Sequence, residues 1–162
     1  MLDPQERREK AMAIFSEGYN CSQSVVKAFA DLLPIEEESL LRLASSFGGG
    51  MGRLREVCGS VSGMFMAAGL LQGYAGPAKG PVKNRHYANI QHLAQKFKEL
   101  HGSIVCRELL HKPPGPEAPQ AEERTPEYYK KRPCREIVGS AAFILAQYLN
   151  ESEAAAKTED IE

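Results

Sequence analysis

The sequence lacks an apolar run long enough to cross a membrane, and it carries almost no net charge. Its longest apolar run, around residues 64–71, is well short of the ~18 residues that a membrane helix needs. Lysine and arginine number 20 against 21 aspartate and glutamate, which gives a formal net charge of −1. No global positive field therefore favours nucleic acid or an anionic membrane as a partner. We expect neither nucleic-acid binding nor membrane insertion.

The N-terminus also lacks the apolar segment of a secretory signal, because residues 1–10 are MLDPQERREK. We therefore expect a cytoplasmic protein. The chain has four cysteines. In a reducing compartment these are not expected to form structural disulfides, and metal binding or redox chemistry becomes the better explanation for them.

Closely spaced cysteine pairs are missing as well. No C-x₂₋₄-C pair of a structural zinc site is present, so zinc is disfavoured. The C-x-x-C of dithiol redox proteins and the C-x-x-C-H of haem attachment are also absent. Any site that uses these cysteines must gather them from distant parts of the chain.

The sequence shows no convincing strand alternation, which predicts an all-α protein. Residues 57–73 are apolar or small on nearly every face, as in a buried central helix. We expect a single-domain bundle of about six to seven helices around this central helix. The bundle should span residues 1–150, with residues 151–162 forming a flexible acidic and alanine-rich tail. Helices are predicted at about 4–17, 20–33, 36–47, 57–73, 82–101, 103–110 and 133–150.

A glycine-rich stretch leads into one cysteine at a predicted helix start. Residues 47–52 are FGGGMG, and Cys58 opens the central helix. A thiol there is favoured as thiolate by unpaired N–H groups and by the positive end of the helix dipole, so Cys58 is a candidate nucleophile. Glycine allows backbone to approach whatever lies opposite, and Ser60 adds a hydroxyl. The glycines expected around the site are Gly48, Gly49, Gly50, Gly52, Gly59 and Gly63.

The other three cysteines repeat this arrangement. Cys21, Cys106 and Cys134 each fall at or near a predicted helix N-terminus, in phase with inward-facing apolar residues. We expect all four to converge at one end of the bundle, where helix dipoles stabilise negative sulfur. The competing interpretation is that each cysteine packs as a small hydrophobic residue. Arginines that would lower thiol pKa values and balance the charge of a four-sulfur site are Arg53, Arg55, Arg107 and Arg135.

Several short segments carry a recognisable pattern: GYNCSQS at 18–24, FGGGMG at 47–52, CGSVSG at 58–63, CR at 106–107, and Cys134. In these segments, and over 18–148 as a whole, the chain resembles a family of redox-active proteins named for its pattern C, GCAxxG, C, C. Ser60 replaces the family's alanine and Val57 the small residue often found before the cysteine, but neither change removes a candidate ligand. The resemblance implies redox chemistry. Similar modules occur in split-Soret-type cytochromes, which look like electron-transfer proteins with an additional iron–sulfur centre.

Three functions follow as hypotheses. The leading one is a [2Fe–2S]-type centre for electron transfer or redox sensing, held by Cys21, Cys58, Cys106 and Cys134. The second is a metal-free thiol–disulfide oxidoreductase in which Cys58 attacks and another cysteine resolves. The third is a non-catalytic helical binding module, with a docking site near the basic segment 128–132. The sequence shows no substrate-level chemistry and does not identify the expected redox partner protein, and a homo-oligomer is left open.

Overall fold

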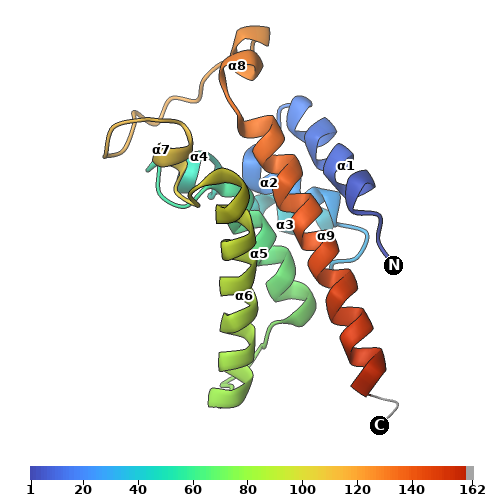
Figure 1. The fold of residues 1–162 in the computed structure, drawn as a ribbon. Coiled ribbons are helices and arrows are strands. Elements are labelled where there is room, and N and C mark those ends of the chain that lie inside the picture. Colours follow the sequence, from blue (N-terminus) through green and yellow to red (C-terminus); the bar gives the residue numbers. More distant parts are fainter. Residues whose placement is uncertain (160–162) are drawn as a thin grey trace.

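The computed structural model describes residues 1–159, which form an all-α single domain as predicted (Figure 1). The longer helices are α1 (Pro4–Ser16), α2 (Cys21–Ala28), α3 (Glu37–Ser45), α5 (Gly59–Gln72), α6 (Gly80–His101) and α9 (Cys134–Glu159). Three short elements complete the chain: α4 (Gly48–Met51), α7 (Cys106–Leu109) and α8 (Pro126–Lys131). Within this part of the chain, β pairing is limited to one isolated antiparallel bridge.

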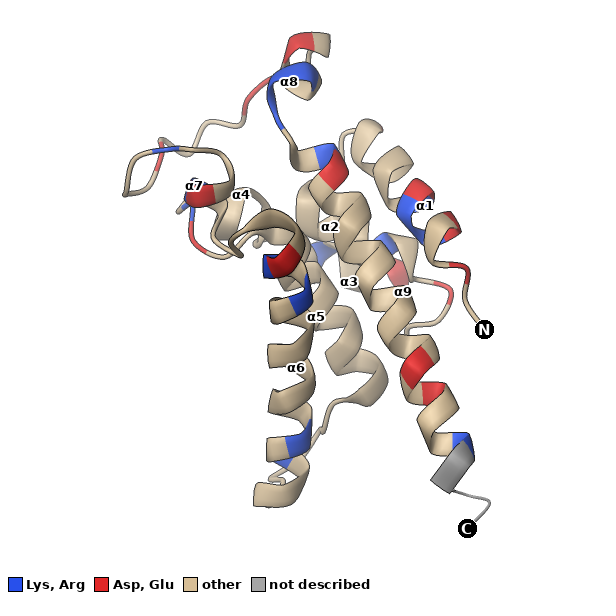
Figure 2. Cartoon of the chain, viewed as in Figure 1, with Lys and Arg blue, Asp and Glu red and all other residues tan. Residues whose placement is uncertain are grey.

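Helix α5 lies inside the bundle and packs against α2, α6 and α9, while α1 packs along α9. Helix α5 carries no charged residue along its length (Figure 2). Val61, Met64 and Ala67 of α5 are fully buried, and α6 contributes Leu93 and Phe97 to the same core. Large apolar side chains buried in this way stabilise the fold by about 1.5–3 kcal/mol each. The predicted central helix is therefore present.

Two glycines let the N-terminal end of α5 approach α2 closely. A Cβ added to Gly59 would lie 3.0 Å from the Cβ of Cys21 and 2.8 Å from the carbonyl oxygen of Phe47. A Cβ added to Gly63 would lie 2.7 Å from the carbonyl oxygen of Ser22. Any side chain at these positions would push the two helices apart. The glycines thus place the start of α2 against the start of α5.

The glycine-rich stretch forms a left-handed turn rather than an open loop. Residues 49–53 all have positive φ, between 61° and 67°. Glycine adopts this conformation freely, whereas Met51 and Arg53 each pay about 1–2 kcal/mol for it. The turn is closed by the N–H of Glu56, which donates to the carbonyl oxygen of Gly50 at 3.0 Å. It holds the chain in one defined path beside the start of α5.

Helix α9 continues without interruption past residue 150, where the sequence predicted the domain to end. The predicted tail, residues 151–162, is therefore helical as far as Glu159, and residues 160–162 lie outside the described part of the chain. Its flexibility stays a prediction. None of the helices within residues 1–159 is long and apolar enough to cross a membrane.

Candidate functional site

All four cysteines sit at helix N-termini and line one cavity of about 50 Å³. Cys21, Cys106 and Cys134 are the first residues of α2, α7 and α9, and Cys58 is the residue that caps α5. All are free thiols; Cys21 is half-buried and the other three are buried. The helix starts that the sequence predicted for these residues are present, and they bring the thiols together from four distant parts of the chain.

Backbone hydrogen bonds hold two of the cysteine segments side by side. The N–H of Cys58 donates to the carbonyl oxygen of Ile104 at 2.8 Å, and the N–H of Cys106 donates to that of Glu56 at 2.6 Å. The isolated antiparallel bridge joins the same two segments. Because main-chain atoms make these bonds, the backbone positions of Cys58 and Cys106 do not depend on contacts of their side chains.

The position of Cys21 is set by a capping box at the start of α2. The Asn20 side chain accepts from the N–H of Gln23 at 2.9 Å, and the Gln23 side chain accepts from the N–H of Asn20 at 3.2 Å. Asn20 also donates through Nδ2 to the carbonyl oxygen of Ser45 at 3.1 Å, which ties the helix start to the end of α3. Asn followed three residues later by Gln is the sequence pattern of such a box, and the reciprocal pair satisfies two backbone donors that a helix N-terminus otherwise leaves free.

Cys21 and Cys134 form a hydrogen-bonded pair of sulfurs. The Cys21 thiol donates to Cys134, which raises the pKa of Cys21 together with burial. The same hydrogen bond lowers the pKa of Cys134 to about 7, against the opposing effect of burial. Nearby positive charges lower the pKa of Cys134 further, in the order Arg132, Arg55 and Arg124. Cys134 is therefore the most acidic thiol of the site.

Cys58 and Cys106 are held as thiols by burial. Burial raises the pKa of Cys58 to about 11, against a smaller opposite effect from the N–H of Ser60. Burial also raises the pKa of Cys106, opposed by a hydrogen bond from Arg55 Nη1 at 3.5 Å. The helix start favours Cys58 as the activated thiol, but burial opposes this, because the loss of hydration favours the neutral thiol. The role of Cys58 as nucleophile stays a prediction.

Residues 19–148 match the model of a protein family described as "Putative redox-active protein (C_GCAxxG_C_C)". The chain belongs to this family. An archaeal relative from Archaeoglobus fulgidus, described as "Uncharacterized protein", is 27% identical over 160 residues, covering 94% of this chain and 99% of its own length. No solved structure matches the chain. The resemblance seen in the sequence is thus confirmed over nearly the whole domain.

In this member of the C_GCAxxG_C_C family, the six glycines predicted around the site have different positions relative to the cavity. Gly49, Gly50 and Gly59 line it, and a Cβ on Gly50 would lie 2.6 Å from the Cβ of Cys106. Three others lie outside it. A Cβ on Gly48 would overlap the Asn20 side chain, Gly63 packs on α2, and Gly52 caps the C-terminal end of α4 at φ +61°. These three shape the backbone that frames the site.

Only part of the predicted arginine set belongs to the cavity of this family member. Arg55 lines it, with 3% of its side chain exposed. Arg53 lies outside the cavity, and like Arg55 it forms an ion pair with Glu117. Arg107 pairs with Glu56 at 3.1 Å, and Arg135 with the Ser16 hydroxyl at 3.1 Å, both outside the cavity. Their placement follows from helix geometry: each succeeds a cysteine by one residue, which turns it about 100° away.

Sequence reasoning missed the residues that close the cavity from the other side. Arg124, Tyr128 and Arg132 line it. Arg124 comes from the segment 111–125 between α7 and α8, which we call the strap, Tyr128 lies in α8, and Arg132 follows the end of α8 (Figure 1). Arg124 packs over the rings of Phe15 and Tyr128, at 4.6 Å and 4.7 Å from their centroids. The basic and aromatic composition of residues 124–132 was the available signal, but the sequence linked only segment 128–132 to a function, as the docking site of a binding module.

Proposed function

We propose that this protein is a redox protein in which Cys21, Cys58, Cys106 and Cys134 ligate an iron–sulfur centre of the [2Fe–2S] type, for electron transfer or redox sensing. The observation that carries the proposal is the convergence of four thiols, from four separate helix N-termini, on one cavity. Chance packing of isolated cysteines has no reason to gather all of them. Membership of a family described as redox-active supports the same chemistry.

The donor set agrees with such a centre in type and number, since four cysteine thiolates are its usual ligands. Among residues 1–159, no group of three or more His, Cys, Asp or Glu side chains is arranged to hold a single metal ion. A mononuclear zinc site takes three or four ligands on one ion, and the sequence has none of the closely spaced cysteine pairs usual for zinc. A [2Fe–2S] cluster divides four cysteines between its two irons and accepts ligands that are widely spaced in the chain.

Buried donors around the cavity support an anionic occupant. In the described part of the chain, Arg55 Nε and Arg124 Nη1 are buried without a hydrogen-bond partner, and both arginines line the cavity. A buried polar group left in this way costs free energy unless a partner is supplied. Together with Arg132, these arginines would offset the charge of four thiolates. When bound, the cluster supplies one-electron redox chemistry.

The test is anaerobic purification followed by visible absorption and by iron and sulfide analysis. We expect a coloured protein with stoichiometric iron and sulfide, and loss of both in each of the four Cys→Ser variants. Ser140→Ala, a buried small residue of α9, is the matched control and should keep the colour. A colourless, metal-free protein after anaerobic purification and reconstitution would sink the proposal.

The hydrogen bond between Cys21 and Cys134 favours a second candidate function, metal-free thiol–disulfide exchange. Here the Cys134 thiolate attacks one sulfur of a substrate disulfide, and the other sulfur leaves as a thiolate. Cys21 then loses its proton and attacks Cys134 in the mixed disulfide, which releases the second substrate thiolate. The substrate gains two electrons, and the protein is left with a Cys21–Cys134 disulfide.

Oxidation of the metal-free protein separates these possibilities. The second candidate predicts one reversible disulfide, between Cys21 and Cys134, on mapping by mass spectrometry. Four thiols that neither bind metal nor oxidise reversibly would leave only the helical binding module. In both redox functions we place the protein in the reducing cytoplasm, where the free thiols persist, and expect a partner protein to exchange electrons with it.

A further inference from the structure

A second pocket, of about 180 Å³, opens beside the cysteine cavity, between the left-handed turn and the strap. The two share part of their lining, including Arg55, Arg124, Tyr128 and Arg132. Arg53 and Glu122 complete the charged lining of the second pocket. A ligand in it would lie directly beside the thiols, whatever those thiols hold.

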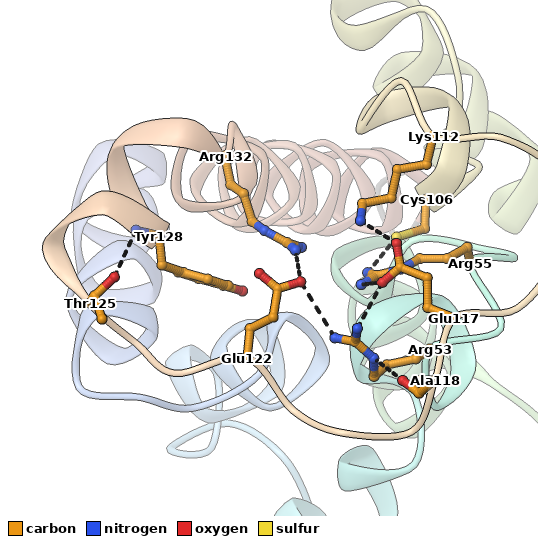
Figure 3. Close-up of polar contacts among 10 residues, drawn as sticks. All are labelled: Arg53, Arg55, Cys106, Lys112, Glu117, Ala118, Glu122, Thr125, Tyr128 and Arg132. Carbon is orange, nitrogen blue, oxygen red and sulfur yellow. Dashed lines mark hydrogen bonds and ion pairs between the residues drawn. The ribbon is translucent and has the colours of Figure 1, made fainter.

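The charges of this pocket are strongly unbalanced. Four guanidinium groups line it against one carboxylate, that of Glu122. Glu122 lies between Arg53 and Arg132 and forms an ion pair with each, at 3.6 Å with Arg53 (Figure 3). Glu117, outside the lining, pairs with Arg53 and Arg55. The four guanidinium groups still outnumber the two carboxylates that pair with them, so an excess of positive charge remains.

Two of these arginines also have hydrogen-bonding capacity to spare. Only 3% of the Arg55 side chain is exposed, and its Nε has no hydrogen-bond partner among the described residues. Arg124 likewise has a buried Nη1 with no partner in the same part of the chain. Arg124 packs over the rings of Phe15 and Tyr128, which keep its guanidinium in place.

We propose that this pocket binds a small oxyanion, of the size of sulfate or phosphate, beside the cysteines. Guanidinium groups present rigid forks of N–H donors that match the oxygens of such ions. The volume is below the roughly 300–1,000 Å³ of pockets that hold drug-sized molecules, which restricts the ligand to a few atoms. Glu122 is an internal anion that competes with the ligand for Arg53 and Arg132. The inference goes beyond the redox function and does not depend on a metal.

The test is calorimetric titration of the full-length, metal-free protein with sodium sulfate, at an ionic strength held constant with sodium chloride. We expect saturable binding at one site. Arg124→Gln should weaken it by about tenfold, because one charge-assisted donor group is lost. Arg107→Gln is the matched control, since Arg107 pairs with Glu56 outside the pocket, and it should bind sulfate as the wild type does.

Arg124 also packs on aromatic rings, so its replacement alone does not separate binding from local folding. Glu122→Gln should change the affinity in the opposite direction. It removes the competing carboxylate, so this variant should bind sulfate several-fold more tightly than the wild type. Sulfate that acts no differently from chloride, or a Glu122→Gln variant with no gain in affinity, overturns the proposal. Because the titration uses metal-free protein, failure of the iron–sulfur proposal leaves this result unaffected.

Discussion

The Arg55 guanidinium donates to the sulfur of Cys106 across 3.5 Å, although the two residues are 51 positions apart. The same guanidinium donates through Nη2 to Glu117 at 2.6 Å (Figure 3). Arg55 therefore connects the thiol site to the strap. Its own backbone also has positive φ, +59°, two residues after the left-handed turn, and its side chain lines the cavity.

Replacement of Arg55 by methionine should make Cys106 less reactive. The hydrogen bond from Arg55 opposes the rise that burial causes in the pKa of Cys106, so its loss raises that pKa further. We expect alkylation of Cys106 at fixed pH to slow by about tenfold, one pKa unit, as measured by mass spectrometry of each cysteine peptide. Arg53→Met is the matched control: it also loses an ion pair to Glu117, but Arg53 lies outside the cysteine cavity. Equal slowing in both variants would contradict the direct role of Arg55.

Gly50→Ala should destabilise the fold and disrupt the site together. The added Cβ would lie 2.6 Å from the Cβ of Cys106 and 2.9 Å from the Cα of Arg55, at a φ of +67°. We expect a loss of about 2–4 kcal/mol in the free energy of unfolding, measured by urea denaturation. Gly52→Ala has the same left-handed strain, but its nearest atom is 3.9 Å away, so it should cost only about 1–2 kcal/mol. Similar losses in the two variants would show that backbone strain, not contact with Cys106, decides the cost.

Local signals in the sequence were enough to predict the helix starts that carry the cysteines. The Asn20–Gln23 capping box and the uncharged α5 depend on residues close together in the chain, and both are present. The extent of α6 was predicted, but its apolar positions do not all face the core: Tyr87 and Leu100 are 54% and 63% exposed, whereas Leu93 is buried. Periodicity gives a helical stripe but does not say where along the helix its partners stop.

The arginines of the site could not be predicted from adjacency to cysteine. Arg107 and Arg135 follow cysteines directly but point elsewhere, whereas Arg124 reaches the cavity from a strap with no regular structure. Its place depends on packing against Phe15, 109 residues earlier in the chain. Contacts of this kind are made by tertiary folding, and one sequence alone carries no pattern for them.

Glu117 should make the stability of the protein depend on pH in the acid range. Hydrogen bonds from Lys112 and Arg55 hold the pKa of Glu117 at about 2, below its ordinary value of 4.5. Folding therefore favours the charged carboxylate, so this stabilisation is complete above about pH 4.5 and is lost as the pH falls toward 2. Glu117→Gln should cost about 1 kcal/mol at pH 7, allowing for solvent screening, and should reduce the fall in Tm between pH 4.5 and pH 2. Glu123→Gln, at a neighbouring position of the strap, is the control and should keep the pH dependence of the wild type.

Cys134 should be the first thiol of the metal-free protein to react as the pH rises. The hydrogen bond from Cys21 lowers the pKa of Cys134 to about 7, so its thiolate is half formed near pH 7, while burial holds Cys58 at about 11. Iodoacetamide alkylation followed by peptide mass spectrometry should give a half-maximal rate for Cys134 near that pH. Cys21→Ala removes the donor and should move the midpoint up by about one unit or more.

Cys58→Ala is the matched control for that measurement, because it removes a thiol of the same cavity that is not among the largest influences on the pKa of Cys134. Its midpoint should stay near pH 7. If the Cys21→Ala and Cys58→Ala proteins gave the same profile as the wild type, the acidity of Cys134 would come from the surrounding arginines. Arg132→Gln would then raise the midpoint, and Cys21 would lose its place as the partner of Cys134 in thiol–disulfide exchange.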